Sequence, residues 1–233
     1  MTQVADTIGA VAGDATVWRN SKELSLLRLG RRSYGEVWDL QRKLLEKRQA
    51  RTIPDTLILV EHDPVYTLGK NAREEHLLQS RRRDVPVFHV ERGGDVTFHG
   101  PGQLVGYPIM DLHDHRLSVS WYMRSLEAVI IRTLRRFDIQ SQRREGLTGV
   151  WVGDGKIAAL GVRLSRWVSM HGFALNIKTD LTFFHGIVPC GIVGYSVVSM
   201  EAILEAKLSL RGVEEALITE FLNIFRFHLL KET

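Results

Sequence analysis

The chain has 233 residues, 44% of them hydrophobic and 25% charged, with a formal net charge of +4. This length is enough to bury a substantial core without a disulfide or a structural metal. One cysteine excludes an internal disulfide and a cysteine-rich zinc site, and it is typical of a reducing compartment. No apolar run approaches the roughly 18 residues of a membrane helix, so we expect no membrane association.

Residues 1–20 predict a flexible N-terminal tail, followed by a single domain over residues 21–233. This tail has no basic region followed by an apolar core, which a signal peptide would require. It carries Asp6 and Asp14 but only one arginine, Arg19, and so does not resemble a mitochondrial transit peptide. We therefore expect a cytoplasmic protein.

In the first half of the chain, short apolar runs predict strands around one clear helix. Residues 23–29 predict a first strand that ends at Gly30, and Ser33 is suited to cap a helix to about Ala50. Four apolar residues share one face of this helix: Val37, Leu40, Leu44 and Leu45. Three further strands are predicted at residues 56–60, 87–90 and 104–110.

The second half contains the most regular helix pattern, at residues 120–137. Its core-facing stripe consists of Leu126, Val129, Ile130 and Leu134. Strand patterns follow at residues 149–152, 156–164 and 167–177, and a last helix is predicted at 213–228. Strands and helices are mixed without strict alternation, which predicts an α/β fold with a mixed or antiparallel sheet and helices packed on it.

Arginine clusters at residues 81–83, 135–136 and 143–144 indicate solvated faces, or alternatively a docking surface for an acidic partner. No nucleic-acid-binding motif accompanies them, so we predict no nucleic-acid partner. His113 and His115 flank Asp114, but two histidines in such a loop are more typical of polar loop residues, and we predict no metal.

Residues 92–103 place four glycines and a proline between two predicted strands. Such a loop either forms a tight hairpin or lets backbone N–H groups approach a ligand closely. Because Arg92, Thr97 and His99 add polar groups to this cradle, we favour a binding loop.

Residues 153–162 resemble a phosphate loop only superficially, because Val150 stands where the first glycine is required and Ile157 where Ser or Thr is required. A hairpin turn at residues 153–155 that delivers Lys156 to an apolar strand is the better interpretation. Such a lysine usually extends to water, although one held in a desolvated site can act as a general base.

Two further segments carry candidate chemistry. Small residues at 171–176 permit close packing of a chain or a ligand, or else a bulged strand. Cys190 lies between Pro189 and Gly191, which predicts a turn rather than a packed element. A lone cysteine is more often buried and inert, and a nucleophilic one needs a partner that takes its proton.

Together these segments resemble the lipoyl(octanoyl) transferase family, also called lipoate–protein ligase B. The resemblance covers residues 61–69, 92–103, 149–162, 171–181 and 188–191, in the family's order and spacing. It implies the α/β catalytic-domain fold shared with biotin and lipoate ligases. It also implies transfer of an octanoyl group from acyl carrier protein to a lysine of lipoyl domains, in 2-oxoacid dehydrogenase E2 subunits and the glycine cleavage H protein, without a cofactor.

Carried over to this chain, the resemblance makes Cys190 the thioester-forming nucleophile and Lys156 its base. The acyl site would consist of Arg92, Gly93, Gly94, Asp95, Val96, Thr97, Phe98, His99, Ala159, Leu160, Gly161, Gly172, Phe173 and Ala174. Residues 196–200 and the Ile177-Lys178 pair depart from the family's usual sequence. Neither departure touches Cys190 or Lys156.

Three alternatives remain open at this point. An ATP-dependent lipoate or biotin ligase would share the fold and need no cysteine, although the chain lacks the Gly-Arg-Gly-Arg-type loop typical of biotin ligases. A non-catalytic module could bind the same acyl carrier. A cysteine hydrolase using His99 or His171 would release free octanoate.

Overall fold

The computed structural model describes residues 22–188 and 195–232. The tail predicted at residues 1–20, and Cys190 with its neighbours at 189–194, lie outside these described residues. One large sheet, in the strand order β12-β1-β2-β6-β10-β9-β8-β7, forms the centre of the molecule, and β11 pairs with β9. Neighbouring strands are parallel in the pairs β12–β1, β1–β2 and β11–β9, and antiparallel elsewhere, so the sheet is mixed as predicted.

The elements follow one another from the N-terminus to the C-terminus, with α2 as the first described helix. The strands of the large sheet are β1 (Glu23–Arg32), β2 (Asp55–His62), β6 (Gln103–Ile109), β7 (Gln142–Arg144), β8 (Leu147–Val152), β9 (Gly155–Ser165), β10 (Val168–Asn176), β11 (Ser196–Val197) and β12 (His228–Glu232). The helices are α2 (Tyr34–Gln49), α3 (Val119–Arg135), α4 (Met200–Leu204) and α5 (Leu210–Phe225), with 3-10 turns η1 (Glu74–His76), η2 (Leu112–Asp114) and η3 (Leu181–Gly186).

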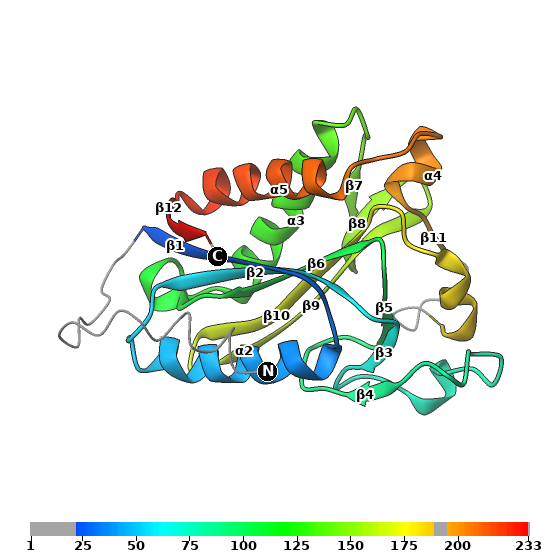
Figure 1. The fold of residues 1–233 in the computed structure, drawn as a ribbon, viewed down its shortest axis with the longest axis horizontal. Helices are drawn as coiled ribbons and strands as arrows, with labels where there is room; N and C mark the ends of the chain where they lie inside the picture. Colours follow the sequence, from blue (N-terminus) through cyan, green and yellow to red (C-terminus); the bar gives the residue numbers. More distant parts are fainter. Residues whose placement is uncertain (1–21, 189–194, 233) are drawn as a thin grey trace.

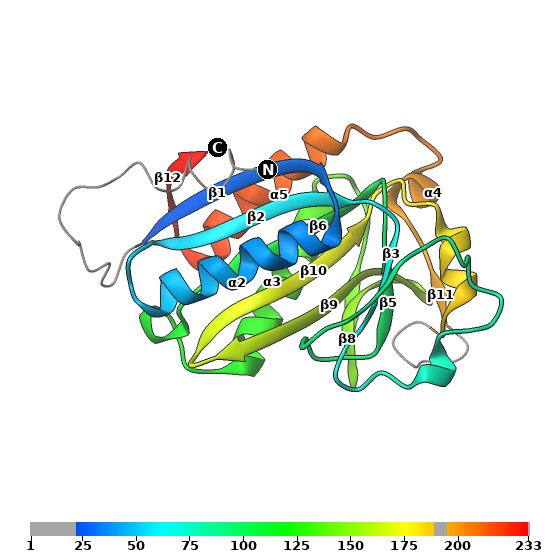
Figure 2. The same ribbon diagram turned by 60° about the horizontal axis from the view of Figure 1, so that its bottom comes forward.

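Helices cover both faces of the large sheet (Figure 1). Because successive residues of a strand point to opposite faces, Leu57 and Leu59 pack in the core beneath α3 and α5, whereas Ile58 and Val60 pack against α2. The turned view in Figure 2 shows α2 running along this second face. No helix within residues 22–188 and 195–232 is long and apolar enough to cross a membrane.

A small three-stranded sheet in the order β4-β3-β5 lies beside the large one, built from β3 (Val65–Leu68), β4 (Val87–His89) and β5 (Val96–His99). It has its own apolar core, in which Phe98 stacks on Phe183 of η3 with ring centroids 4.4 Å apart. The small sheet therefore packs against η3 through β5, the strand that follows the glycine-rich turn.

The helix predicted from Ser33 is confirmed, with Ser33 as the N-cap residue of α2. Two predicted ends are wrong. The first strand continues past Gly30, which adopts φ +61° where the register with β2 shifts, so this glycine makes a bulge rather than an end. The last helix stops at Phe225 because Arg226 turns left-handed at φ +59°, and the chain then pairs with β1 as β12.

A cluster of buried charges lies at the C-terminal end of α2. Arg48 donates from Nε to Asp55 at 2.7 Å and from Nη2 to Asp114 at 2.5 Å, and its Nη1 lies 3.7 Å from Asp111. The two histidines of the neighbouring loop have separate carboxylate partners, since His113 pairs with Asp111 and His115 pairs with Asp55. These histidines therefore join a structural ion cluster.

Candidate active site

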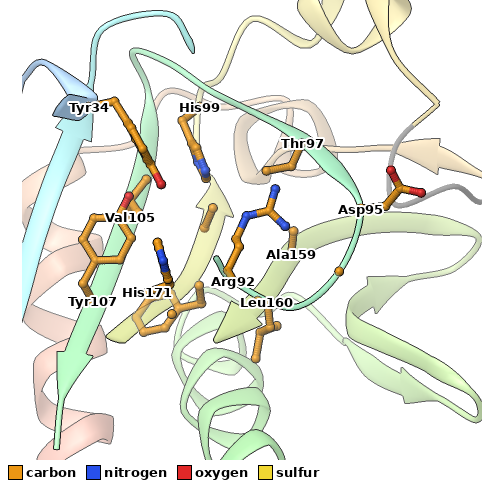
Figure 3. Close-up of a pocket in the computed structure, with 15 residues that line it drawn as sticks. Tyr34, Arg92, Asp95, Thr97, His99, Val105, Tyr107, Ala159, Leu160 and His171 are labelled. Atoms are coloured by element: carbon orange, nitrogen blue, oxygen red, sulfur yellow. The ribbon is translucent and has the colours of Figure 1, made fainter. Parts of the chain in front are cut away.

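A pocket of about 460 Å³, its open mouth included, lies between the glycine-rich loop and the middle strands of the large sheet. Its lining consists of Tyr34, Arg92, Gly94, Asp95, Thr97, His99, Val105, Tyr107, Ala159, Leu160, Gly161, His171, Gly172, Phe173 and Ala174. In Figure 3, Tyr34, Tyr107 and His171 lie on one side of the pocket and Asp95 on the other, with Arg92 between them. Sites for small ligands have this mixture of apolar walls with a few polar groups.

The structure brings together eleven of the fourteen substrate-binding residues named from the sequence. The other three do not line the pocket. Because β5 alternates, Thr97 and His99 face the pocket, while Val96 and Phe98 point into the core of the small sheet. Gly93 serves the loop itself, donating its N–H to the Val162 carbonyl at 2.9 Å.

Arg92 is buried, and its guanidinium is fixed by neighbouring backbone. One terminal nitrogen donates to the carbonyl and to the hydroxyl of Thr67, at 2.7 and 2.9 Å, and the other donates to the Gly93 carbonyl at 3.1 Å. The two terminal nitrogens of the guanidinium thus reach acceptors on two different residues, which the single nitrogen of a lysine would not do. The side chain therefore ties the loop to β3 while lining the pocket.

Glycines on β9 and β10 let the backbones around the pocket approach closely. A side chain at Gly161 would meet the Gly93 carbonyl oxygen at 2.8 Å and the Arg92 stem at 3.2 Å. At Gly172, a Cβ would collide with the Gly106 carbonyl on β6. The small residues expected in these segments are thus required by close packing as well as by the space they leave in the pocket.

Three buried histidines line or support the pocket, and burial keeps them neutral. Loss of water lowers the pKa of His99 to about 3, and it lowers those of His62 and His171 to about 4. His62 donates from Nδ1 to the Arg32 carbonyl, which can only accept, so its Nε2 accepts from the Tyr107 hydroxyl at 2.8 Å. Burial also raises the pKa of Tyr107 and of Tyr34.

His171 differs from the other two imidazoles in its environment. It is 1% exposed, yet neither ring nitrogen has a hydrogen-bond partner among the described residues, and the Glu91 carboxylate lies 3.8 Å from Nε2. Its backbone is left-handed, with φ +57°, and its N–H bonds to the Gln41 side chain at 2.8 Å. Residues 171–176 form the C-terminal part of β10 and end with it at Asn176, so the predicted place at the end of a strand is confirmed.

The sequence did not identify Tyr34, Val105 and Tyr107 as pocket residues. Tyr34 is the first residue of α2, and its ring stacks parallel to that of His99 with centroids 6.0 Å apart. Val105 and Tyr107 belong to a fully buried stretch of β6, where aliphatic and aromatic residues are typical of any core strand. No local pattern distinguishes them from core residues.

Lys156 lies outside the pocket lining, at the start of β9. It is 6% exposed, so the expectation that it extends to water is wrong. Its Nζ lies 4.8 Å from the centre of the Trp151 ring on β8. The turn predicted before it is confirmed, since β8 ends at Val152, Gly153 adopts φ +52° and β9 begins at Gly155.

Cys190 lies outside the described residues, but the residues that flank its segment are anchored. On one side, Val188 donates its N–H to the carbonyl of His76, whose ring bonds to the pocket residue Asp95 at 2.6 Å. On the other side, the Tyr195 ring meets the Trp151 ring edge-on, with centroids 5.1 Å apart. One flank is thus linked to the pocket and the other to the aromatic ring that contacts Lys156.

Residues 33–222 match the lipoyl protein ligase A/B catalytic domain family. Solved structures of ligases share this fold, and two are compared below. A lipoate protein ligase from Thermoplasma acidophilum is 16% identical with a TM-score of 0.68, covering 91% of this chain and 88% of its own. A biotin protein ligase from Aquifex aeolicus is 11% identical with a TM-score of 0.53, covering 88% and 71%. The predicted fold class is confirmed.

Sequence relatives narrow this class. An octanoyltransferase of Solibacter usitatus is 49% identical over 209 residues, which are 88% of this chain and 94% of that protein. One from Christiangramia forsetii is 41% identical, covering 90% and 98%. The chain therefore belongs to the lipoyl protein ligase A/B catalytic domain family and, within it, to the octanoyltransferases, as the sequence predicted.

Proposed function

We propose that the chain transfers an octanoyl group from octanoyl-acyl carrier protein to a lysine of a lipoyl domain, through a thioester on Cys190. The observation that carries this proposal is the arrangement around the pocket, in which the segment bearing the only cysteine is flanked by residues linked to the pocket and to the ring beside Lys156. The acyltransferase activity of the family supplies the reaction class.

In the first step, Lys156 takes the proton of the Cys190 thiol, and the thiolate attacks the carbonyl carbon of the octanoyl thioester. Backbone N–H groups would stabilise the oxyanion that forms. The bond to the phosphopantetheine sulfur then breaks, and that sulfur leaves with the proton held by Lys156. The octanoyl group is now joined to Cys190.

In the second step, the amine of the acceptor lysine attacks the acyl-enzyme carbonyl. The carbon–sulfur bond to Cys190 breaks, an amide forms, and the amine gives its proton to Lys156, which returns it to the cysteine. The same dyad thus serves both halves of a ping-pong reaction.

The pocket would hold the hydrocarbon chain during both steps. Ala159, Gly161 and Ala174 line it with little side-chain bulk, and the histidines beside them are uncharged. Burial of an eight-carbon chain at about 0.8 kcal/mol per CH₂ would contribute roughly 5 kcal/mol to binding.

The acceptors we propose are lipoyl domains of 2-oxoacid dehydrogenase E2 subunits and the glycine cleavage H protein. A neighbour in fold supports this choice, since the T. acidophilum ligase was solved in a study of that enzyme and its E2 lipoyl domain. We also infer a cytoplasmic location, on the ground that a single free cysteine suits a reducing compartment.

Intact-mass spectrometry tests the covalent step. After incubation with octanoyl carrier protein, the wild-type chain should gain one octanoyl group that neutral hydroxylamine removes, and Cys190→Ala should gain none. An adduct that persists in Cys190→Ala would overturn the nucleophile assignment. Addition of a lipoyl domain should discharge the wild-type adduct onto a lysine without ATP. Transfer that required ATP and free octanoate would instead favour the ligase reaction.

A further inference from the structure

Trp151 is a fully buried aromatic residue directly opposite Lys156 in the ladder of β8 and β9. Residues opposite each other in an antiparallel pair project to the same face, and a register shift between Val150 and Trp151 sets this pairing. The Lys156 Nζ lies 4.8 Å from the ring centre, within the roughly 6 Å over which a ring face attracts a cation. The indole is therefore a direct contact of the lysine head group.

The stem of Lys156 is held on its other side by a residue without a side chain. A Cβ at Gly149 would lie 3.1 Å from the Lys156 Cε and 2.9 Å from the Ala158 carbonyl oxygen. Gly149 also adopts φ +135°, a conformation that other residues rarely reach. Gly149 and Trp151, on the same strand, thus leave room for the lysine stem and place an aromatic face at its end.

Trp151 has a second contact, with Tyr195, the first described residue after the segment that carries Cys190. The Tyr195 ring meets it edge-on at 5.1 Å, and the next two residues, Ser196 and Val197, pair with Gly155 and Lys156 as β11. The N–H of Val198 bonds to the Lys156 carbonyl at 3.1 Å. The Trp151 ring therefore contacts both Lys156 and Tyr195, which is five residues after Cys190 in the sequence.

The other charged groups near the Trp151 ring are paired with opposite charges, so they do not oppose its contact with Lys156. From β7, Arg144 lies 4.9 Å from the ring centre, but it is paired with the Asp154 carboxylate. From α3, the Glu127 carboxylate accepts from the Gly149 N–H and forms ion pairs with Arg124 and Arg143.

We propose that Trp151 is a positioning residue that holds the Lys156 head group and favours its ammonium form, the form that it takes after it accepts the proton of the nucleophile. The aromatic face attracts an ammonium and not a neutral amine, so it stabilises the pair after the proton has moved from the cysteine sulfur to Nζ. This inference rests on the proposed function, because the thiol that gives up the proton is Cys190.

Alkylation of the cysteine by iodoacetamide across a pH series tests the proposal. The chain has one cysteine, so the modification reports on Cys190 alone. Trp151→Leu should move the midpoint of the alkylation profile upward by about half to one pH unit, because a less firmly held cation stabilises the thiolate less. The kcat of octanoyl transfer should fall about tenfold, with the KM for octanoyl carrier protein changing less than about threefold.

Trp151→Phe keeps an aromatic face, so its alkylation midpoint and its kcat should both stay close to the wild-type values. It provides the measurement if the leucine variant does not fold. Phe221→Leu is the matched control, since Phe221 is equally buried but packs against Phe225 and Phe227 in the main core. It should lower stability and leave the alkylation midpoint in place. A midpoint in Trp151→Leu equal to that of the Phe221 control would overturn the inference. If wild type forms no octanoyl adduct at all, the proposed function fails first.

Discussion

The two ends of helix α2 bury polar groups in opposite ways. At its C-terminal end, the Arg48 guanidinium lies among the carboxylates of Asp55, Asp111 and Asp114, each of which faces an opposite charge. At its N-terminal end, about 20 Å away along the helix axis, Tyr34 borders the pocket that contains His171, whose ring nitrogens have no hydrogen-bond partner among the described residues.

This difference distinguishes the ion cluster around Arg48, which is structural, from the pocket, which is the candidate active site. Buried charges remain ionised only when neighbours compensate them, and the cluster around Arg48 meets that condition while joining α2 to β2 and η2. Buried imidazoles can instead lose their charge, and those of the pocket do so, while both ring nitrogens of His171 have no hydrogen-bond partner among the described residues. We therefore expect mutations at the two ends to act differently: loss of a charge at the first lowers the stability itself, whereas replacement of an imidazole at the second changes how the stability depends on pH.

The largest effect is expected for Arg48→Met. It would leave buried carboxylates without their main counter-charge and lower the free energy of unfolding by about 3–5 kcal/mol, measured by urea denaturation. Octanoyl transfer per folded molecule should be retained. Arg42→Met on the same helix is the control, because the Arg42–Asp39 pair is exposed and its loss should cost less than about 1 kcal/mol. Equal losses of unfolding free energy in Arg48→Met and Arg42→Met would contradict a special role for the buried cluster.

An intermediate effect is expected at the pocket end, from the pH dependence of stability in His171→Asn. Burial holds the folded pKa of His171 at about 4, whereas the unfolded chain takes up a proton near pH 6.5. As the pH falls below 6.5, the unfolded state binds the extra proton and the wild type is destabilised by about 1.4 kcal/mol per pH unit, down to the folded pKa. Asparagine does not titrate and tolerates the left-handed backbone of this position.

The measurement is the difference in unfolding free energy between wild type and His171→Asn. It should be constant above about pH 7.5, where the imidazole is neutral in both states, and should shift in favour of the variant between about pH 6 and 4. A difference that stayed constant over the whole range would mean that the folded protein accepts a proton on His171 as readily as the unfolded chain.

Local sequence patterns predicted the helices and the central strands well, because amphipathic periodicity is determined within each segment. The stripe from Leu126 to Leu134 placed α3 within two residues of its observed ends. Strands β3, β5, β7, β11 and β12 were missed, since such short strands gain their stability from partners distant in the sequence. Val65–Leu68, for example, pairs with β4 and β5, which follow it by about 20 to 30 residues.

For the site, the family resemblance indicated the pocket walls at residues 159–161 and 172–174, whereas the glycines of residues 92–103 by themselves allowed either a tight hairpin or a binding loop. Tyr34 and Tyr107 gave no such signal, as aromatic residues at these places are typical of a core. The burial of Lys156 depends on Gly149 and on Trp151, whose alignment follows from a register shift between two strands. Such a shift is a property of the assembled sheet, so the sequence favoured an exposed lysine.

The smallest effect should come from Arg51→Gln at the rim of the charged cluster. Arg51 pairs with Asp111 and Asp114 at 3.2 Å, but its side chain is 31% exposed, so water already screens these contacts. Arg48 would still compensate both carboxylates, and the loss in unfolding free energy should stay below about 1 kcal/mol. A loss near that of Arg48→Met would show that the two arginines act as one unit. The double variant would then lose little more than either single one, because a coupled pair is not additive.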